Sequence, residues 1–446
     1  MGFLSTLSAV LLIFTGCYFT FAFRAFYLRR PIRTLRMMPM SNGIKQMLLS
    51  LGGTVGVGNI SGVAVAIMLG GAGAVFWMWV GAFFAMALKC AEITLGMFYR
   101  HGASHYIKQA LGSVAATIFT LLLVADVITM GGMIQASAIS EAVFTAYGIS
   151  PLVSGVTISV LAATVFFFKI DLFRLSAYVV PIMSVGYTIA SLSVIALFLN
   201  NIPNVLSSIF KSAFCFDSAI GGVLGFVFTP AFRQGMVKGL FSNEAGCGTA
   251  PLAHAASCEK SPAKQGLFGR LEVFIDTLLM CTLTAFVILL TLGSDIDNHD
   301  GGVGVCVRAF KSLFGGASAS ILALFVFLFA FSAIVSFGYY GTQCLSFFNC
   351  SEKGKNLFLI VFCMALLAGA VATPTIVWSI ADAVICVMLL INTTAVFIFR
   401  KSIIKAHYTH IGKYSHNASK TRSCSSGRMK KEIPMSDTEI KRGSTL

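Results

Sequence analysis

The chain has 446 residues, of which 57% are hydrophobic and only 11% are charged, and its formal net charge is +15 at pH 7. Soluble domains contain about 25% charged residues, so this composition excludes an ordinary soluble protein. The positive charge does not indicate nucleic-acid binding, because the basic residues lie in short loops between apolar segments and in a polar tail. The 12 Cys are scattered singly, which is typical of buried free thiols.

The apolar segments are long enough to cross a membrane. A spanning helix needs about 20 mostly apolar residues, and the segments lack the alternation of a β-barrel strand, which favours helices. The first segment is followed, rather than preceded, by an Arg cluster, so we expect a retained span and not a signal peptide. The eleven predicted spans are residues 4–23, 46–70, 73–99, 113–145, 151–169, 176–199, 217–255, 268–292, 315–349, 356–373 and 376–399.

The positions of the basic residues predict the orientation of the chain. Of the 32 Lys and Arg residues, only Lys211, Arg308 and Lys311 lie in the loops on one side, three lie within spans, and the others lie on the opposite side. Cytoplasmic loops carry the excess of Lys and Arg. An odd number of spans then places the N-terminus outside and the C-terminus in the cytoplasm of a bacterial plasma (inner) membrane. We expect residues 401–446 to be a disordered basic tail.

The second span contains a glycine-rich polar stretch at residues 52–62. Each of its five Gly would cost a continuous helix about 1 kcal/mol relative to Ala, so the stretch favours an unwound helix near the bilayer centre. Irregular backbone at that depth is tolerated only where it lines a cavity or is buried in protein. The alternative is a small-residue packing face on a continuous helix.

The seventh span contains the second stretch of this kind, at residues 235–251. Each interrupted span opens a run of five spans, and two such runs enter the membrane from opposite sides, as an inverted repeat requires. This pattern is typical of secondary transporters, whose binding site lies near the bilayer midplane between the two breaks. We therefore predict repeats at 46–199 and 200–400, preceded by an extra helix and a basic loop at 1–45.

Unwound backbone supplies the ligands for such a site. Amides at the start of a half-helix favour an anion, so those of Val57 and Gly58, with the Thr54 hydroxyl, are suited to a substrate carboxylate. The carbonyls freed at the opposite ends attract either a substrate ammonium or a metal ion. Asn243 can donate and accept a hydrogen bond, which suits a zwitterion.

At these two stretches the sequence resembles the alanine/glycine:cation symporter family of the amino acid–polyamine–organocation superfamily. Residues 53–64, 70–79 and 89–92 are similar to the family's first core helix and the segment after it, residues 239–254 to its most recognisable block, and residues 274–277 to a further block. The resemblance implies an all-α integral membrane protein with a five-plus-five inverted repeat and two discontinuous helices, as in the leucine-transporter-like fold. It also implies a transporter and not an enzyme: sodium-coupled symport of alanine or glycine across the lipid bilayer by alternating access, with sodium as the co-transported ion and no cofactor.

The resemblance also implies site residues. By position, the family's substrate site falls on Thr54, Gly56, Gly58, Gln135, Phe241, Asn243 and Phe337, and the backbone argument adds Val57. By wider analogy with the fold, a sodium site would use the carbonyls of Gly52, Val55 and Phe329 and the hydroxyl of Ser332.

This sequence departs from the family pattern near the site. Phe337 stands where the family usually has Trp, Ser332-Ala333 replaces a Thr-Thr pair, and Thr342 replaces a Glu. These changes leave open a proton-coupled or altered-specificity amino acid permease of the same fold. A channel or a membrane sensor is a more distant alternative.

Several charged residues lie within the predicted spans. Lys89 and Glu92 have the i, i+3 spacing of a structural ion pair. We expect Asp276 to pair with Arg270 or Lys264 near the cytoplasmic rim.

Three further ionisable residues, Asp126, Glu244 and His254, also lie within predicted spans. Asp126 has no obvious partner and is either a proton-coupling site or a hydrogen-bonded buried acid. We expect Glu244 to brace the broken helix and His254 to lie at the membrane interface.

Overall fold

The computed structural model describes residues 2–24, 31–38, 40, 43–214, 229–293, 296, 301–372 and 374–410. This part of the chain is helical and contains no strand. The first residues predicted for the seventh span, 217–228, and the tail from 411 onward lie outside the described residues.

Within the described part of the chain, seven helical stretches are long and apolar enough to cross a membrane. Three more apolar helices there have 10–17 residues, and one of these, Ser61–Gly70, follows a break. The long stretches are Gly73–Tyr99, Ala103–Tyr147, Leu172–Leu197, Pro262–Thr291, Gly302–Ser346, Glu352–Val371 and Val377–Ile398, and the short ones are Thr6–Ala22, Ser61–Gly70 and Pro151–Phe167.

Each predicted span contains at least one helix, and three further helices, at 31–36, 202–213 and 302–314, lie in segments predicted as loops. Proline stands at the first turn of several of them, where its missing N–H has no partner to lose. In the first half they are α1 (Gly2–Ala22), α3 (Pro31–Arg36), α4 (Ile44–Thr54), α5 (Ser61–Gly70), α6 (Gly73–Tyr99), α7 (Ala103–Ile128), α8 (Gln135–Tyr147), α9 (Pro151–Phe167), α10 (Leu172–Leu197) and α11 (Ile202–Ala213). In the second half they are α12 (Pro230–Asn243), α13 (Ala250–His254), α14 (Pro262–Val273), α15 (Thr282–Thr291), α16 (Gly302–Phe314), α17 (Ser318–Ser346), α18 (Glu352–Val371) and α19 (Pro374–Ile398).

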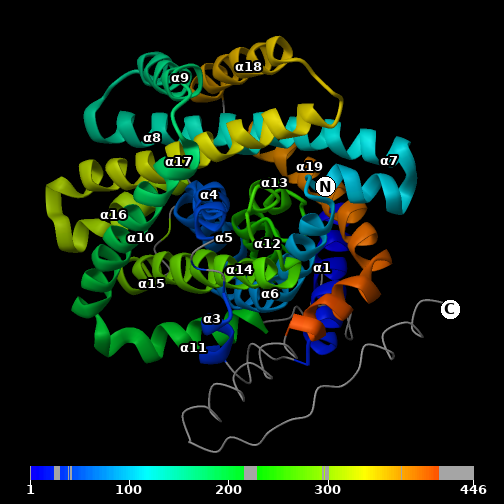
Figure 1. Ribbon diagram of the computed structural model, residues 1–446. Helices are drawn as coiled ribbons and strands as arrows, with labels where there is room; N and C mark the ends of the chain where they lie inside the picture. The colour runs from blue at the N-terminus through cyan, green and yellow to red at the C-terminus, as the bar shows by residue number, and fades with distance from the viewer. Residues whose placement is uncertain are drawn as a thin grey trace, which may run out of the picture.

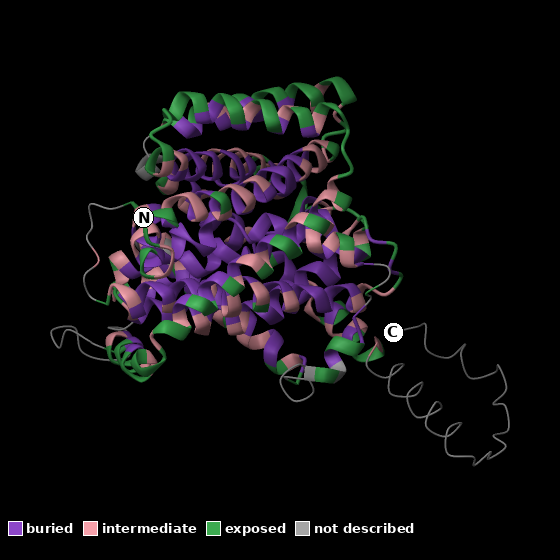
Figure 2. Ribbon diagram, turned by 90° about the vertical axis from the view of Figure 1, so that its left-hand side faces the viewer, coloured by how far each residue is buried: buried purple, intermediate pink, exposed green. Residues whose placement is uncertain are grey.

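The two interrupted helices lie in the middle of the bundle. In Figure 1, α4 and α5 stand beside α12 and α13 at the centre, and longer helices surround them. Helix α6 packs against both α12 and α14, α17 packs against α4, and α9 packs against α18 at the edge of the molecule. Figure 2 shows that buried residues fill the centre while exposed ones follow the outer helices. The fold therefore encloses the segments that the sequence predicts to carry the site.

Two other helices contain π-helical stretches. Residues Thr129–Ile134 join α7 to α8, and residues Phe274–Cys281 join α14 to α15. Such stretches occur frequently at functional sites, because they widen the helix and leave backbone groups free to shift. Gln135, directly after the first stretch, and Asp276, within the second, contact the breaks.

The first ten residues of the tail that was predicted to be disordered, 401–410, are helical. Ile403 is fully buried there, and the ring of His407 lies 4.2 Å from that of Phe23, which directly follows α1. These apolar contacts hold the first ten residues of the predicted tail against the bundle.

The π-helical stretch before α8 packs against α18 through a glycine. A Cβ on Gly369 would lie 2.6 Å from the carbonyl oxygen of Met133, which real Cβ atoms essentially never do. Gly369→Ala should therefore destabilise the protein by about 1–3 kcal/mol, because a backbone shift is needed to fit the methyl group. The measurement is thermal unfolding of the purified protein in detergent. Gly316→Ala, where nothing lies within 4 Å, is the control, and equal melting temperatures for the two variants would contradict this packing.

Candidate functional site

The second span is interrupted where the sequence predicts it. Helix α4 ends at Thr54, Gly56 is extended with φ −120° and ψ −153°, and α5 begins at Ser61 after a single 3₁₀ turn. The amide of Gly56 donates to Asn59 Oδ1 at 3.1 Å, and that of Val57 donates to Gln135 Oε1 at 3.2 Å. The first break is thus closed by two neutral carboxamide side chains.

The seventh span is interrupted as well. Helix α12 ends at Asn243, Glu244 adopts a left-handed conformation with φ 52°, and α13 begins at Ala250. Gly246 and Gly248 have φ values of 84° and 82°, which L side chains rarely adopt. The alternative predicted for the second span, a continuous helix with a small-residue packing face, is wrong.

Lys89 and Glu92 do not form the predicted ion pair with each other. Lys89 Nζ donates to the carbonyl oxygen of Asn243 at 2.8 Å, whereas Glu92 accepts from the amides of Gly246 at 2.6 Å and Gly248 at 3.2 Å. The two ends of a broken helix carry opposite partial charges, negative at the carbonyls and positive at the amides. Two opposite charges one turn apart on α6 match those two ends, so they clamp the second break.

Glu272 is the partner that the sequence analysis missed. Its carboxylate lies 3.2 Å from Lys89 Nζ, accepts from Ser50 Oγ at 2.9 Å and lies 2.6 Å from His254 Nε2. The prediction of an interfacial His254 is wrong, because its ring is fully buried between Glu272 and Gln265. The signal was present in the sequence, since a carboxylate within a span is functional or paired by default.

Asp276 connects the two breaks. Its carboxylate accepts from Asn59 Nδ2 of the first break at 2.8 Å and from Ser242 Oγ beside the second at 2.7 Å. Thr277 Oγ1 also donates to it, at 2.7 Å.

The predicted partners of Asp276 make other contacts. Lys264 pairs with Glu259 at 3.1 Å, and the Arg270 guanidinium lies 5.0 Å from the ring centre of Phe23. The prediction failed because Asp276 is fully buried on the face of its helix that meets the breaks.

Most of the predicted substrate residues come together around the first break. Gln135 accepts a hydrogen bond from the amide of Val57. A Cβ on Gly56 would lie 3.0 Å from Gln135 Oε1, and a Cβ on Gly58 would lie 3.3 Å from the Phe241 ring. Thr54 is buried at the end of α4. The absence of side chains at the two glycines therefore keeps the amides of the break open to a neighbouring group.

Asn243 and Phe337, which were expected to line the substrate site, contact the second break and the π-helical stretch Thr129–Ile134 respectively. Asn243 donates to Thr277 Oγ1 at 3.1 Å and accepts from the amide of Ala245 at 3.1 Å, so its side chain braces the second break. Phe337 fills the space beside Gly131 in the π-helical stretch and lies 5.4 Å from the ring of Tyr340.

An aromatic and charged cluster surrounds Phe241. Its ring centre lies 4.4 Å from that of Trp378. Lys238 Nζ lies 4.2 Å from the Trp378 ring centre and 3.1 Å from the carboxylate of Asp382. An ion pair and two rings thus cover this side of the breaks.

Two of the four predicted sodium ligands, Gly52 and Ser332, lie against each other. A Cβ on Gly52 would lie 2.6 Å from Ser332 Oγ, and Phe329 is buried one turn earlier on α17. Ser332 Oγ is buried and has no hydrogen-bond partner among the described residues, whereas Ser336 donates to the Leu49 carbonyl at 2.8 Å. Val55 is the C-cap residue that follows α4. A buried hydroxyl without a described partner, next to the end of a broken helix, is an oxygen ligand that suits a hard monovalent cation.

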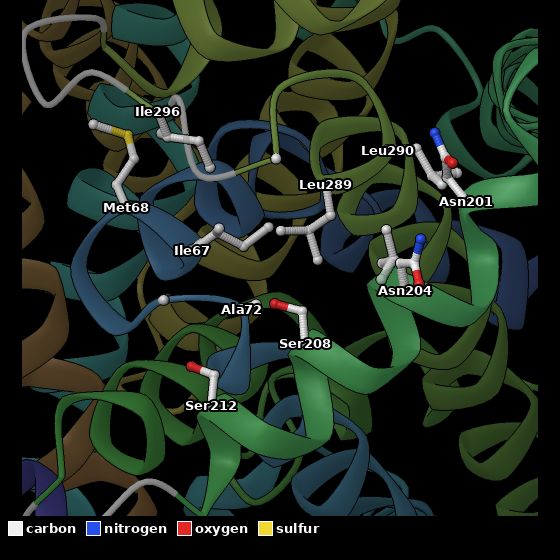
Figure 3. Close-up of a pocket in the computed structure, with 13 residues that line it drawn as sticks. Ile67, Met68, Ala72, Asn201, Asn204, Ser208, Ser212, Leu289, Leu290 and Ile296 are labelled. Carbon is white, nitrogen blue, oxygen red and sulfur yellow. The ribbon is translucent and has the colours of Figure 1, made fainter.

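The predicted site residues are all buried, so the breaks are closed to solvent. A cavity of about 720 Å³ lies farther out, between the end of α5 and α11. In Figure 3, Asn204 and Ser208 on α11 face the apolar side chains of Ile67 and Leu289 across it. This cavity has hydrogen-bonding groups on one wall and hydrocarbon on the other.

Comparisons with known proteins agree with this architecture. The model of the sodium:alanine symporter family matches residues 2–424. The chain is 34% identical over 391 residues to the putative sodium/proton-dependent alanine carrier protein YrbD of Bacillus subtilis, covering 82% of this chain and 80% of that protein. It is 33% identical over 358 residues to the sodium/alanine symporter AgcS of Methanococcus maripaludis, covering 75% of this chain and 77% of that protein.

Two further comparisons concern a relative named for another amino acid and a solved structure. The probable sodium/glutamine symporter GlnT of Bacillus subtilis is 33% identical over 423 residues, covering 90% of this chain and 87% of that protein. A solved structure of the manganese transporter of Eremococcus coleocola shares the fold, with a TM-score of 0.55 and 14% identity over 79% of this chain and 75% of that one. With a family model matched along nearly its whole length and apolar helices long enough to cross a bilayer, this multi-pass membrane protein belongs to the sodium:alanine symporter family.

Proposed function

We propose that the protein is a secondary active transporter that couples sodium to the symport of alanine, glycine or a similarly small neutral amino acid by alternating access. The observation that carries this proposal is the pair of broken helices at the centre of the bundle, closed to solvent and linked by Asp276. The name of AgcS gives sodium and alanine for that relative, and the name of GlnT gives glutamine. Relatives with such names support an amino acid as the cargo.

The proposal includes the repeat and the orientation. Eleven spans, with an extra helix at 1–45 and repeats at 46–199 and 200–400, put one break at the start of each repeat. The excess of basic residues on one side then places the N-terminus outside and the C-terminus in the cytoplasm of a bacterial inner membrane. The two observed interruptions support this arrangement.

The two breaks have different partners, and this difference assigns their roles. The second break is held by Lys89 and Glu92, whose charges match its ends and whose removal would leave buried charges unpaired. The first break is held by the neutral carboxamide of Gln135. A substrate carboxylate is a stronger acceptor than a carboxamide oxygen, so it can replace Gln135 at the amide of Val57.

Lys89 also determines where the substrate ammonium binds. Its Nζ already donates a hydrogen bond to the carbonyl of Asn243, at the C-terminal end of α12 that attracts cations. The ammonium is therefore left to the carbonyls freed at the first break. Asn243 itself holds the second break in shape through Thr277 and Ala245 and acts on the substrate through that geometry.

The sodium ion would bind where α4 meets α17. Gly52, Val55 and Phe329 offer carbonyls there, and Ser332 offers the hydroxyl that has no partner among the described residues. The ion would tie the inner half of the broken second span to α17. Sodium binding and the closed conformation would then stabilise each other.

The first test is transport itself. In proteoliposomes, an inward sodium gradient should drive the uptake of labelled alanine or glycine, and Asn243→Ala should lower that uptake at least about tenfold, because a misplaced binding geometry costs on that order. Asn356→Ala, on the exposed start of α18, is the matched control and should transport normally. Uptake that ignores the sodium gradient but follows a pH gradient would replace sodium with protons as the driving ion.

A second test introduces a carboxylate side chain that competes with the substrate carboxylate at the first break. Gln135→Glu would put a carboxylate beside the amide of Val57, so the half-saturating concentration of alanine should rise about tenfold or more, the size of one charge-assisted hydrogen bond. Radioligand binding to purified protein measures it. Gln109→Glu, which is exposed on α7, should bind alanine like the wild type. An unchanged affinity in Gln135→Glu would show that the carboxylate binds elsewhere.

A third test concerns the sodium site. Ser332→Ala should raise the sodium concentration that half-saturates uptake by roughly tenfold, the value of one lost ligand of 1–1.5 kcal/mol. Alanine affinity at saturating sodium should stay close to the wild-type value. Ser346→Ala on the exposed end of the same helix is the control, and equal sodium dependence in the two variants would rule out Ser332 as a ligand.

A further inference from the structure

A buried carboxyl group beside the second break has no role in the symport mechanism above. Asp126 lies on α7 with 1% of its surface exposed, and neither of its oxygens has a hydrogen-bond partner among the described residues. Glu244, in the second break, is also 1% exposed, and its Oε1 is likewise unpartnered in that part of the chain. Glu244 is close enough to act electrostatically on Asp126.

The two carboxyls differ in what surrounds them. Glu244 accepts from Thr249 Oγ1 and is close enough to Lys89 to be stabilised by that charge. The titratable groups that share an electrostatic interaction with Asp126 in the described structure are Glu244 and Cys247 from the second break and Cys344 from α17. None of these is a cation.

An ionised carboxylate in such surroundings is very unfavourable. Burial without a hydrogen bond or a counter-charge costs so much that the group takes up a proton instead, and a neighbouring carboxylate adds to that cost. A metal ion is a poor alternative, because sodium prefers several oxygen ligands and two of the neighbouring groups are Cys thiols. The described residues also contain no cluster of three or more His, Cys, Asp or Glu that could hold a metal.

We propose that Asp126 is a proton-binding site that carries a proton in the closed conformation and releases it to water when α7 separates from the second break and α17. The step is the dissociation of a carboxylic acid: the O–H bond breaks, the electron pair stays on the carboxylate, and the proton passes to water. No other reactant is needed. The inference rests on the proposed function, since it adds a proton to a sodium-coupled cycle.

The position of Asp126 links this proton to the substrate site. It lies three residues before the π-helical stretch Thr129–Ile134, and Gln135 follows directly after that stretch. Gln135 is the group that holds the amide of Val57. A change of charge at Asp126 therefore acts on a helix that is already irregular at its π-helical stretch. The same helix carries Gln135, the side chain that the substrate carboxylate would displace from Val57.

The sign of the effect follows from linkage. If the closed, substrate-loaded form binds one proton more than the open form, alanine affinity must rise as pH falls, approaching about tenfold per pH unit while the open form is ionised. Asp126→Asn imitates the protonated acid, so this variant should bind alanine with an affinity that changes little with pH. Asp126→Glu keeps an ionisable group and should restore the pH dependence.

The experiment measures sodium-dependent alanine binding to the purified full chain between pH 6 and about pH 9, a range that brackets the titration of buried carboxyls. Glu141→Gln is the matched control, because Glu141 is a half-buried acid on α8 that accepts hydrogen bonds from the backbone of Val303 and Gly304. It should keep the wild-type pH dependence. The same pH dependence in wild type and Asp126→Asn, or none in the wild type, would overturn the proposal.

A second readout does not need a substrate. The closed form holds a proton that the unfolded chain has already lost at neutral pH, because an exposed Asp ionises at about pH 4. The melting temperature of the wild type should therefore fall as pH rises above that value, and that of Asp126→Asn should fall less. Parallel curves for the two proteins would also overturn the proton site. The proposed function fails separately, through an absence of sodium-driven uptake in the wild type, so the two failures can be told apart.

Discussion

Hydrogen bonding of interrupted backbone inside a bilayer is the constraint on which this structure depends. Lipid offers no donor or acceptor, so each amide and carbonyl freed by a break must find a partner in the protein. At the second break those partners are the ammonium group of Lys89 and the carboxyl group of Glu92. Glu272 in turn balances Lys89, and His254 and Ser50 bond to Glu272. Much of the buried polar chemistry of the bundle exists to keep one helix open.

The first break satisfies the same constraint with weaker groups. Carboxamides of Gln135 and Asn59 accept from its amides, and no described ion pair holds them. A neutral acceptor can be exchanged for a substrate carboxylate without leaving a buried charge behind, whereas a charged one cannot. The contrast between a fixed break and an exchangeable one gives a physical reason why two similar interruptions can have different functions.

The sequence alone located the interruptions well. Glycine-rich polar stretches at 52–62 and 235–251 are costly in a continuous helix wherever they occur, and both are broken in the structure. The residues around the first break were also found, because Gln135 and Phe241 do lie against it. These predictions succeeded because they depend on local backbone preference and on a resemblance concentrated in those stretches.

The partners of the breaks could not be predicted in the same way. Lys89 and Glu92 have a spacing that fits a helical ion pair equally well, and only the docking of α12 and α13 against α6 decides between the two arrangements. Asp276 is far in sequence from Asn59, and His254 was placed at the interface because its span was expected to end there. Spacing along one helix carries no information about which distant backbone group will face it.

Asp276 has a mechanical consequence for how the bundle can move. Its bonds to Asn59 and Ser242, together with the clamp from α6, tie α4, α5, α6, α12 and the segment containing α14 into one hydrogen-bonded body. Helices α8, α9 and α18 meet one another through close glycine and methyl contacts, such as Gly155 on Ala370, and through a bond from Ser159 Oγ to the carbonyl of Cys363. No described ion pair joins these three helices. The contacts that shift at low cost therefore lie in this outer group, and the bond from Gln135 to Val57 connects α8 to the hydrogen-bonded body.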